Sequence, residues 1–120
     1  MNLIKQALKL GENKVIGIVA AIHENKRQDL FMLIANEIKQ LYPRIKFLIV
    51  GDIYENTEKE VLFKQKVIDM CRNLNLDNDV IFTGYRNDVN RLFKLLDVFV
   101  LTSKHEACGD VIIEAMAAGK

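Results

Sequence analysis

The chain has 120 residues, half of them hydrophobic, which is enough for one compact core and too little for two ordinary domains. Its 17 Lys and Arg residues balance 16 Asp and Glu residues to a formal net charge of +1, which argues against a nucleic-acid-binding protein and provides no general attraction to an anionic membrane. Cys71 and Cys108 form neither a disulfide framework nor a zinc-binding motif, and no apolar run approaches the roughly 18 residues of a membrane span. We therefore expect a cytoplasmic protein without a signal peptide, a metal site or a membrane-spanning segment.

Short apolar segments alternate with segments of helical periodicity along the chain. Residues 14–22 have the continuous, β-branched apolar character of a strand that is buried on both faces, and residues 28–42 follow with apolar side chains at helical spacing until Pro43. In the second unit, Thr57 and Glu60 predict a capping box at the start of the helix. The further predicted strands are 45–52, 79–85 and 97–103, and the further predicted helices are 57–76, 88–96 and one that begins at about residue 110.

Four alternations of strand and helix predict an α/β fold, a doubly wound, Rossmann-like parallel sheet with helices on both faces. The common strand order in such sheets is 3-2-1-4, which brings the carboxyl ends of the first and fourth strands together at the topological switch point, where ligands bind. The two loops that meet there are predicted to be 20–28, with the sequence AAIHENKRQ, and 102–110, with the sequence TSKHEACGD.

These two loops carry groups that suit a nucleotide sugar. The backbone N–H groups of residues 110–113, at the predicted start of the last helix, can hold a phosphate. Lys26 and Arg27 lie on the opposite loop and supply positive charge for a diphosphate. Glu106 and Glu114 flank the anion, and carboxylates accept hydrogen bonds from sugar hydroxyl groups. The arrangement favours a ligand with a diphosphate in the middle and a polyol at each end.

The segment EACGDVIIE (106–114), with two glutamates in the spacing E-x7-E and followed by AMAAGK, resembles the signature of retaining, nucleotide-sugar-dependent glycosyltransferases of the GT-B fold. The segments IGIVAAIHENKRQDLFMLIANEI, FLIVGD and VIFTGYRNDVNRLFKLLDVFVLTS are similar, in that order, to the C-terminal, donor-binding domain of this group 1 family. The resemblance covers about residues 14–120. It implies that residues 1–120 are a partial nucleotide-sugar-binding domain, that the N-terminal acceptor domain and the end of this domain are absent, and that the isolated fragment is inactive.

The resemblance also implies roles for individual residues. Glu106 would contact the transferred sugar and Lys26 the diphosphate, so these two are the candidate catalytic residues. Glu114 would bind the ribose hydroxyls, and the segment around Arg86 would contact the base. The family usually has an arginine five residues before the lysine, where this sequence has Ala21, and whether Arg27 compensates stays open. The remaining candidate donor-binding residues are Ala107, Cys108, Gly109, Asp110 and Val111.

The implied activity is transfer of a sugar from a nucleotide diphosphate sugar to an acceptor hydroxyl with retention of configuration, in polysaccharide or glycoconjugate biosynthesis. No cofactor and no metal are expected, because the leaving diphosphate would be stabilised by Lys26 and backbone amides. The acceptor would be positioned by the missing N-terminal domain. Association of the full-length enzyme with the inner face of the membrane stays open, and the truncated fragment is expected to expose apolar surface and to self-associate.

Two alternatives remain at this point. A nucleotide-sugar epimerase shares the same fold, and a receiver-like signalling module is also a single doubly wound domain. The receiver requires acidic residues after the first strand and an aspartate at the end of the third, where this sequence has residues 20–22 (AAI) and 83–84 (TG). A dinucleotide oxidoreductase is disfavoured because no G-x-G-x-x-G follows the first strand. Cys71 is interpreted as a core residue and His23 as a polar loop residue.

Overall fold

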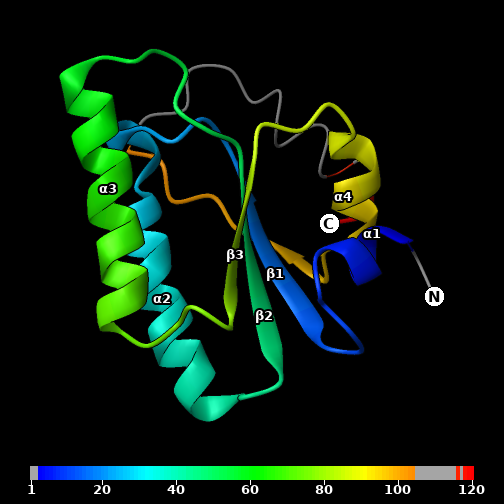
Figure 1. The fold of residues 1–120 in the computed structure, drawn as a ribbon. Helices are drawn as coiled ribbons and strands as arrows, with labels where there is room; N and C mark the ends of the chain where they lie inside the picture. Colours follow the sequence, from blue (N-terminus) through cyan, green and yellow to red (C-terminus); the bar gives the residue numbers. More distant parts are fainter. Residues whose placement is uncertain (1–2, 105–115, 117) are drawn as a thin grey trace.

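A computed structural model describes residues 3–104, 116 and 118–120. Strands and helices alternate through most of this range, as the sequence predicts (Figure 1). The elements are α1 (Leu3–Ala7), β1 (Lys14–Val19), the 3-10 helix η1 (Glu24–Lys26), α2 (Gln28–Leu41), β2 (Ile45–Val50), α3 (Glu58–Asn73), β3 (Val80–Gly84), α4 (Val89–Leu95) and β4 (Val98–Phe99).

The strands form one four-stranded parallel sheet in the order β3-β2-β1-β4. This confirms the predicted fold class and strand order. Along β1 the pairing with β2 is regular from Lys14 opposite Ile45 to Val19 opposite Val50. Because β1 and β4 are neighbours in the sheet, the loops that leave their carboxyl ends emerge side by side.

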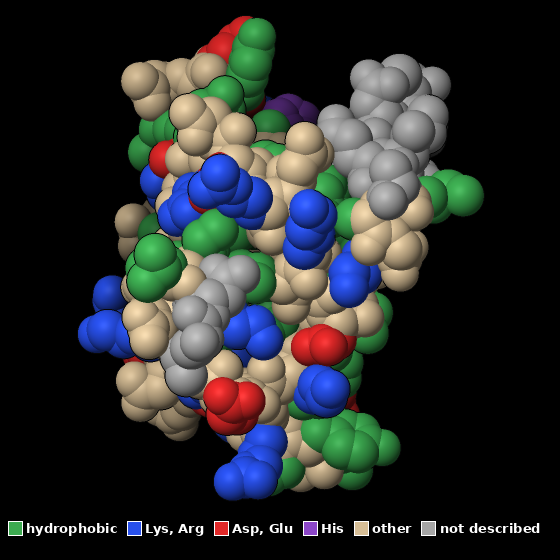
Figure 2. Space-filling model, turned by 90° about the vertical axis from the view of Figure 1, so that its right-hand side faces the viewer, with side chains coloured by type: hydrophobic (Ala, Val, Ile, Leu, Met, Phe, Trp, Pro, Cys, Tyr) green, Lys and Arg blue, Asp and Glu red, His purple; other side chains and the backbone are tan. Residues whose placement is uncertain are grey.

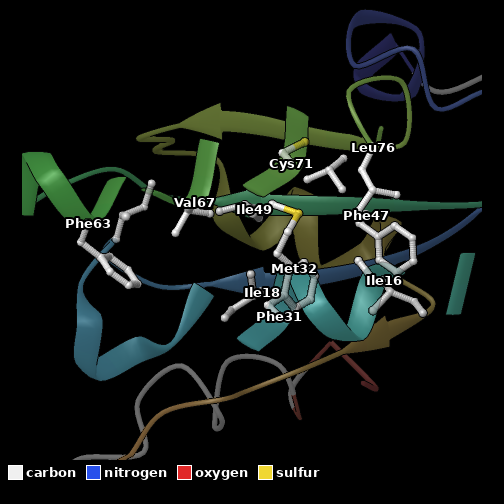
Figure 3. Packing of buried hydrophobic residues seen from close by; sticks show 13 residues of the cluster. Ile16, Ile18, Phe31, Met32, Phe47, Ile49, Phe63, Val67, Cys71 and Leu76 are labelled. Carbon is white, nitrogen blue, oxygen red and sulfur yellow. The ribbon is translucent and has the colours of Figure 1, made fainter. Parts of the chain in front are cut away.

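Helices cover both faces of the sheet, with α2 and α3 on one side and α1 and α4 on the other (Figure 1). Successive side chains of a strand point to opposite faces, so the buried strands contribute to two cores. Ile18 of β1 packs toward α2 and α3, in the core that contains the edge-to-face pair of Phe31 and Phe47, with ring centroids 6.2 Å apart (Figure 3). Val19 of β1 belongs to the second core, with Leu92 and other residues around α4.

The start of α3 differs in detail from the predicted capping box. The hydroxyl oxygen of Thr57 accepts a hydrogen bond from the Glu60 backbone N–H at 3.2 Å, as predicted. The Glu60 carboxylate accepts a hydrogen bond from the backbone N–H of Glu55 at 2.7 Å. Glu55 lies two residues before the N-cap, in the loop after β2. The cap therefore also fixes the end of that loop.

Two boundaries depart from the predictions. The fourth strand has two residues, Val98–Phe99, and not the predicted 97–103: the Val100 N–H still donates to the Gly17 oxygen of β1, but from Thr102 on the chain forms hydrogen bonds with the loop after β1. The short helix α1 was not predicted, and the chain after it buries Leu10 completely in the second core. The predicted helix from residue 110 lies outside the described residues. No helix among the described residues is long and apolar enough to cross a membrane.

Candidate functional site

The loops after β1 and β4 are joined directly at the carboxyl edge of the sheet. The hydroxyl of Thr102 donates to the backbone oxygens of Lys26, at 2.6 Å, and Arg27, at 3.0 Å. The Lys104 backbone N–H donates to the Asn25 oxygen at 2.9 Å. The predicted meeting of the two loops at the switch point is thus confirmed, and Lys26 lies beside the segment that leads to Glu106.

The backbone around Lys26 is held by two side chains whose role the sequence analysis did not assign. Gln28 is fully buried; its amide donates to the Ala21 oxygen at 2.9 Å, and its own oxygen accepts from the His23 N–H at 3.4 Å. His23 caps η1, since its Nδ1 accepts from the Asn25 N–H at 3.0 Å. His23 therefore has a structural role in the loop. Gln28 could have been found from the sequence, because it precedes Phe31, Met32 and Ala35 on the buried stripe of α2, where a polar residue needs partners.

The side chain of Arg27 pairs with Asp29 in the first turn of α2. Arg27 has a left-handed backbone conformation, with φ of 55°, and its guanidinium forms an ion pair with Asp29, Nε to Oδ1, at 3.0 Å. Lys66 of α3 lies 3.4 Å from the same carboxylate. Burial alone would raise the pKa of Asp29, but the hydrogen bonds from Arg27, the Leu30 backbone and Lys66 together hold it below its usual value. Arg27 does not line the cavity at Ala21 described next, so these contacts do not support a substitution of Arg27 for the missing arginine.

A cavity of about 350 Å³ opens at the carboxyl ends of β1, β2 and β3. Apolar side chains of the strands and of α4 form much of its wall. Tyr54 and Tyr85 also line the cavity, although their exposed fractions are 85% and 82%. Arg86 lines the cavity, and its role in donor binding stays a prediction. The loop after β2, with Tyr54, was missed by the sequence analysis, although the parallel order brings every strand's carboxyl end to this edge. The complete lining is Val19, Ala20, Ala21, Val50, Gly51, Asp52, Ile53, Tyr54, Tyr85, Arg86 and Val89.

The close approach of the β1 and β2 loops shapes this cavity. Beyond the strands, the Ala20 N–H donates to the Val50 oxygen at 3.0 Å, and the Ile22 N–H donates to the Asp52 oxygen at 2.9 Å. Gly51 has φ of +128°, and a Cβ atom at this position would lie 2.0 Å from the Ala20 oxygen. Only glycine allows the two loops to run this close together.

The charged residues at the cavity are in ion pairs. Arg86 donates to Asp88 from Nε at 2.8 Å and from Nη2 at 2.7 Å, and this hydrogen bonding lowers the pKa of Asp88. Asp52 accepts from Lys64 at 2.8 Å and from the Ile53 N–H at 2.8 Å. The bond from Lys64 is the main cause of a lowered Asp52 pKa, against burial, which raises it. Both carboxylates are therefore ionised at neutral pH.

The E-x7-E segment lies outside the described residues. This applies to Glu106 and Glu114 and to the candidate donor-binding residues Ala107, Cys108, Gly109, Asp110 and Val111. Their roles stay predictions. Within the part of the chain that the structure describes, no group of three or more His, Cys, Asp or Glu residues could hold a metal ion.

Comparisons with known proteins give consistent results. Residues 2–120 match the family described as glycosyl transferases group 1. Mannosylfructose-phosphate synthase of Agrobacterium fabrum is 30% identical over 112 residues, which are 90% of this chain and 24% of that protein. Among solved structures, Anabaena HepE in complex with UDP-glucose is 29% identical with a TM-score of 0.86, and the match covers 98% of this chain and 31% of HepE. The C-terminal domain of Francisella tularensis LpcC, a glycosyl transferase group 1 protein, is 26% identical with a TM-score of 0.77, over 94% of this chain and 60% of that one.

The chain spans about a quarter of the length of the curated relatives it matches. The sheet order and the helices around it are those of GT-B glycosyltransferase structures. These matches rule out the receiver-like signalling module that the sequence analysis had left open.

Proposed function

The chain belongs to the glycosyl transferases group 1 family, and from this premise we propose that it forms the donor-binding part of an enzyme that transfers a sugar from a nucleotide diphosphate sugar to an acceptor hydroxyl, with retention of configuration. One observation carries the proposal. The loop with Lys26 is hydrogen-bonded to the segment after β4, next to a cavity at the ends of β1, β2 and β3. Solved relatives support the donor class, because HepE has been crystallised with UDP and with UDP-glucose.

The donor would lie along the carboxyl edge of the sheet. Its base would occupy the cavity beside Arg86, and its ribose would be held by Glu114. The diphosphate would then reach Lys26, whose ammonium group is an effective partner for phosphate oxygens. The transferred sugar would lie toward Glu106. The backbone N–H groups of residues 107–111 would complete the contacts to phosphate and sugar.

The chemistry required of these residues is stabilisation of the leaving group. As the bond between the sugar and the diphosphate breaks, negative charge grows on the phosphate oxygens, and a fixed ammonium group and fixed amides stabilise that charge most when they need no rearrangement. The bonds from Thr102, His23 and Gln28 fix the backbone on both sides of Lys26 in this way. The acceptor would be bound by a part of the enzyme outside this chain, and the reaction would take place in the cytoplasm.

Isothermal titration calorimetry with a panel of nucleoside diphosphates and nucleotide sugars tests the proposal. We expect binding of a nucleoside diphosphate and of its sugar conjugate, and Lys26→Ala should weaken both, since both carry the diphosphate. Lys94→Ala is the matched control, because Lys94 lies on α4 beside a separate surface hollow. Absence of binding for the whole panel, or equal effects of the two substitutions, would overturn the proposed function.

A further inference from the structure

One side chain, Thr102, joins the loop after β4 to the turn that carries Lys26. Its hydroxyl donates to two backbone oxygens, that of Lys26 at 2.6 Å and that of Arg27 at 3.0 Å. A hydroxyl has a single hydrogen, so this is a bifurcated hydrogen bond, and both acceptors lie on the same side of the turn. Thr102 is 76 residues from Lys26 along the chain, so the contact exists only when the two loops are brought together by the fold.

The turn between η1 and α2 has an unfavourable backbone conformation at the place that Thr102 binds. Arg27 has φ of 55° and ψ of 48°, a left-handed conformation that is unfavourable for a residue with a Cβ atom. It is both the C-cap of η1 and the N-cap of α2, and its side chain makes no capping hydrogen bond. The two oxygens that accept from Thr102 belong to the peptide groups on either side of this φ and ψ pair. The hydroxyl therefore stabilises the turn at its strained residue.

The other described contacts of this region are of a different kind. The buried amide of Gln28 bonds to the backbone of Ala21 and His23, and these bonds stay within the loop after β1. A second bond across the two loops runs from the Lys104 N–H to the Asn25 oxygen, at 2.9 Å, and it involves only backbone atoms. Loss of the Thr102 hydroxyl would therefore weaken the junction of the two loops and leave the internal bonds of each loop in place.

A ligand that contacts both loops binds most tightly when the loops are already joined. In the proposed function, the diphosphate would reach Lys26 on one loop and the backbone N–H groups of residues 107–111 beyond the other. If the junction is open part of the time in the free protein, the apparent affinity falls with the joined fraction, because binding must first close the junction. A nucleoside without phosphates would not reach Lys26, so its affinity would not depend on the junction.

We propose that Thr102 is a positioning residue for the phosphate groups of the donor: its hydroxyl keeps the Lys26 turn joined to the loop after β4 before the donor binds. The inference rests on the proposed function, because it needs a diphosphate at Lys26. It deepens that function by assigning the joined state of the two loops to one side chain outside the predicted donor-binding residues. Thr102 acts through Lys26 and not by contact with the donor.

Thr102→Val tests the positioning role, with UDP and uridine as probes. Uridine has the base and the ribose of UDP but no phosphate, and UDP is the nucleotide bound to HepE. Valine keeps the branched shape of threonine and removes the hydroxyl, so the full chain should bind UDP about threefold to tenfold more weakly, the change expected for one hydrogen bond of ordinary strength. Calorimetry measures this loss, and NMR titration should show an unchanged affinity for uridine.

Further variants at the same position keep the test independent of the fold of one variant. Thr102→Ser retains the hydroxyl and should keep most of the affinity for UDP. Thr102→Ala is a second variant without the hydroxyl and makes the same comparison if the valine variant does not fold. If another nucleoside diphosphate of the panel binds more tightly than UDP, that diphosphate and its nucleoside replace UDP and uridine.

Double variants separate the positioning of Lys26 from a general loss of structure. In Lys26→Ala the group that Thr102 positions is missing, so adding Thr102→Val should weaken UDP binding little further. Lys94→Ala removes an equal charge from α4, on the side of the molecule shown in Figure 2, where several Lys and Arg side chains gather, and there Thr102→Val should have its full effect. Thr83→Val is the matched control, because the Thr83 hydroxyl also donates to a backbone oxygen, that of Gly84 at 2.9 Å. It should leave the UDP to uridine affinity ratio unchanged.

The outcomes separate this inference from the proposed function. Unchanged UDP affinity in Thr102→Val, an equal loss for UDP and uridine, or an equal loss in Thr102→Ser and Thr102→Val would overturn the positioning role and leave donor binding intact. A full additional loss when Thr102→Val is added to Lys26→Ala would do the same, because Thr102 would then act on a group other than Lys26. If no member of the nucleotide panel binds the unmodified chain, the proposed function itself is wrong and the inference falls with it.

Discussion

The two edges of the sheet carry ion pairs of similar exposure that have different consequences. At the amino edge, Asp79 contacts Lys39 at 2.5 Å and Lys46 at 3.5 Å, and these three side chains are 12%, 25% and 20% exposed. This cluster joins α2, β2 and the turn before β3. At the carboxyl edge, Arg86 and Asp88 are two residues apart, and their pair joins no distant elements. A pair between elements distant in sequence fixes the fold, whereas a pair between near neighbours fixes the direction of one side chain.

The largest effect is expected from a substitution at Gly51, which lies at the carboxyl edge but brings together two loops that are distant in sequence. In Gly51→Ala the new Cβ would lie 2.0 Å from the Ala20 oxygen, at a φ of +128°. We expect a loss of about 2 kcal/mol or more in the free energy of unfolding, together with loss of nucleotide binding. Urea denaturation and calorimetry measure the two effects.

Gly84→Ala is the control for Gly51→Ala. Gly84 also has a positive φ, of +72°, but a Cβ atom there would have nothing within 4 Å. A larger loss for Gly51→Ala is expected from the steric contact with the Ala20 backbone and from the less accessible φ of +128°. Equal destabilisation by both substitutions would show that the close approach of the loops is not a constraint.

The amino-edge cluster should produce the next largest effect. Asp79→Ala removes the partner of Lys39 and Lys46, and a loss of about 1–2 kcal/mol in stability is expected, because the two ammonium groups remain partly exposed and recover some hydration. Nucleotide affinity should not change, since the cluster lies at the opposite end of the sheet from the cavity. Thermal unfolding and calorimetry on the same sample check both statements.

Asp88→Ala completes the comparison with Asp79→Ala. It should change stability less, because Asp88 provides no capping hydrogen bond to α4 and pairs only with a neighbour in sequence. It should nevertheless weaken binding of nucleoside diphosphates, because Arg86 lines the cavity. If Asp88→Ala destabilised the protein more than Asp79→Ala, the distinction between the two edges would be wrong.

Much of the fold, and less of the site, was predictable from the sequence. The continuous apolar strands and the helical stripes predict the parallel sheet and its order, because burial on both faces leaves few alternatives. The meeting of Lys26 with the loop after β4 follows from that order. The position of Tyr54 at the cavity does not follow from the strand order, because an exposed tyrosine in a loop has no periodic pattern that predicts the direction of its side chain. The ion pair of Arg27 with Asp29 was also missed, because neighbouring charges in a loop have no sequence pattern that predicts which of them will pair.

The smallest expected effect concerns the pH dependence of the carboxyl-edge pair. The hydrogen bond from Arg86 holds the pKa of Asp88 below its usual value of about 4. A carboxylate with a lowered pKa in the folded state contributes stability above the pKa of the unfolded chain and loses it as pH falls through the folded value. The stability difference between the unmodified chain and Asp88→Asn should therefore be constant from pH 8 to about pH 5 and shrink in more acidic solution, as Asp88 takes up a proton and the pair weakens. Urea denaturation at stepped pH measures this difference, and Lys94→Ala, on α4 beside the separate surface hollow, serves as the reference. A difference that grew as the pH fell would mean that Arg86 does not stabilise the ionised form of Asp88.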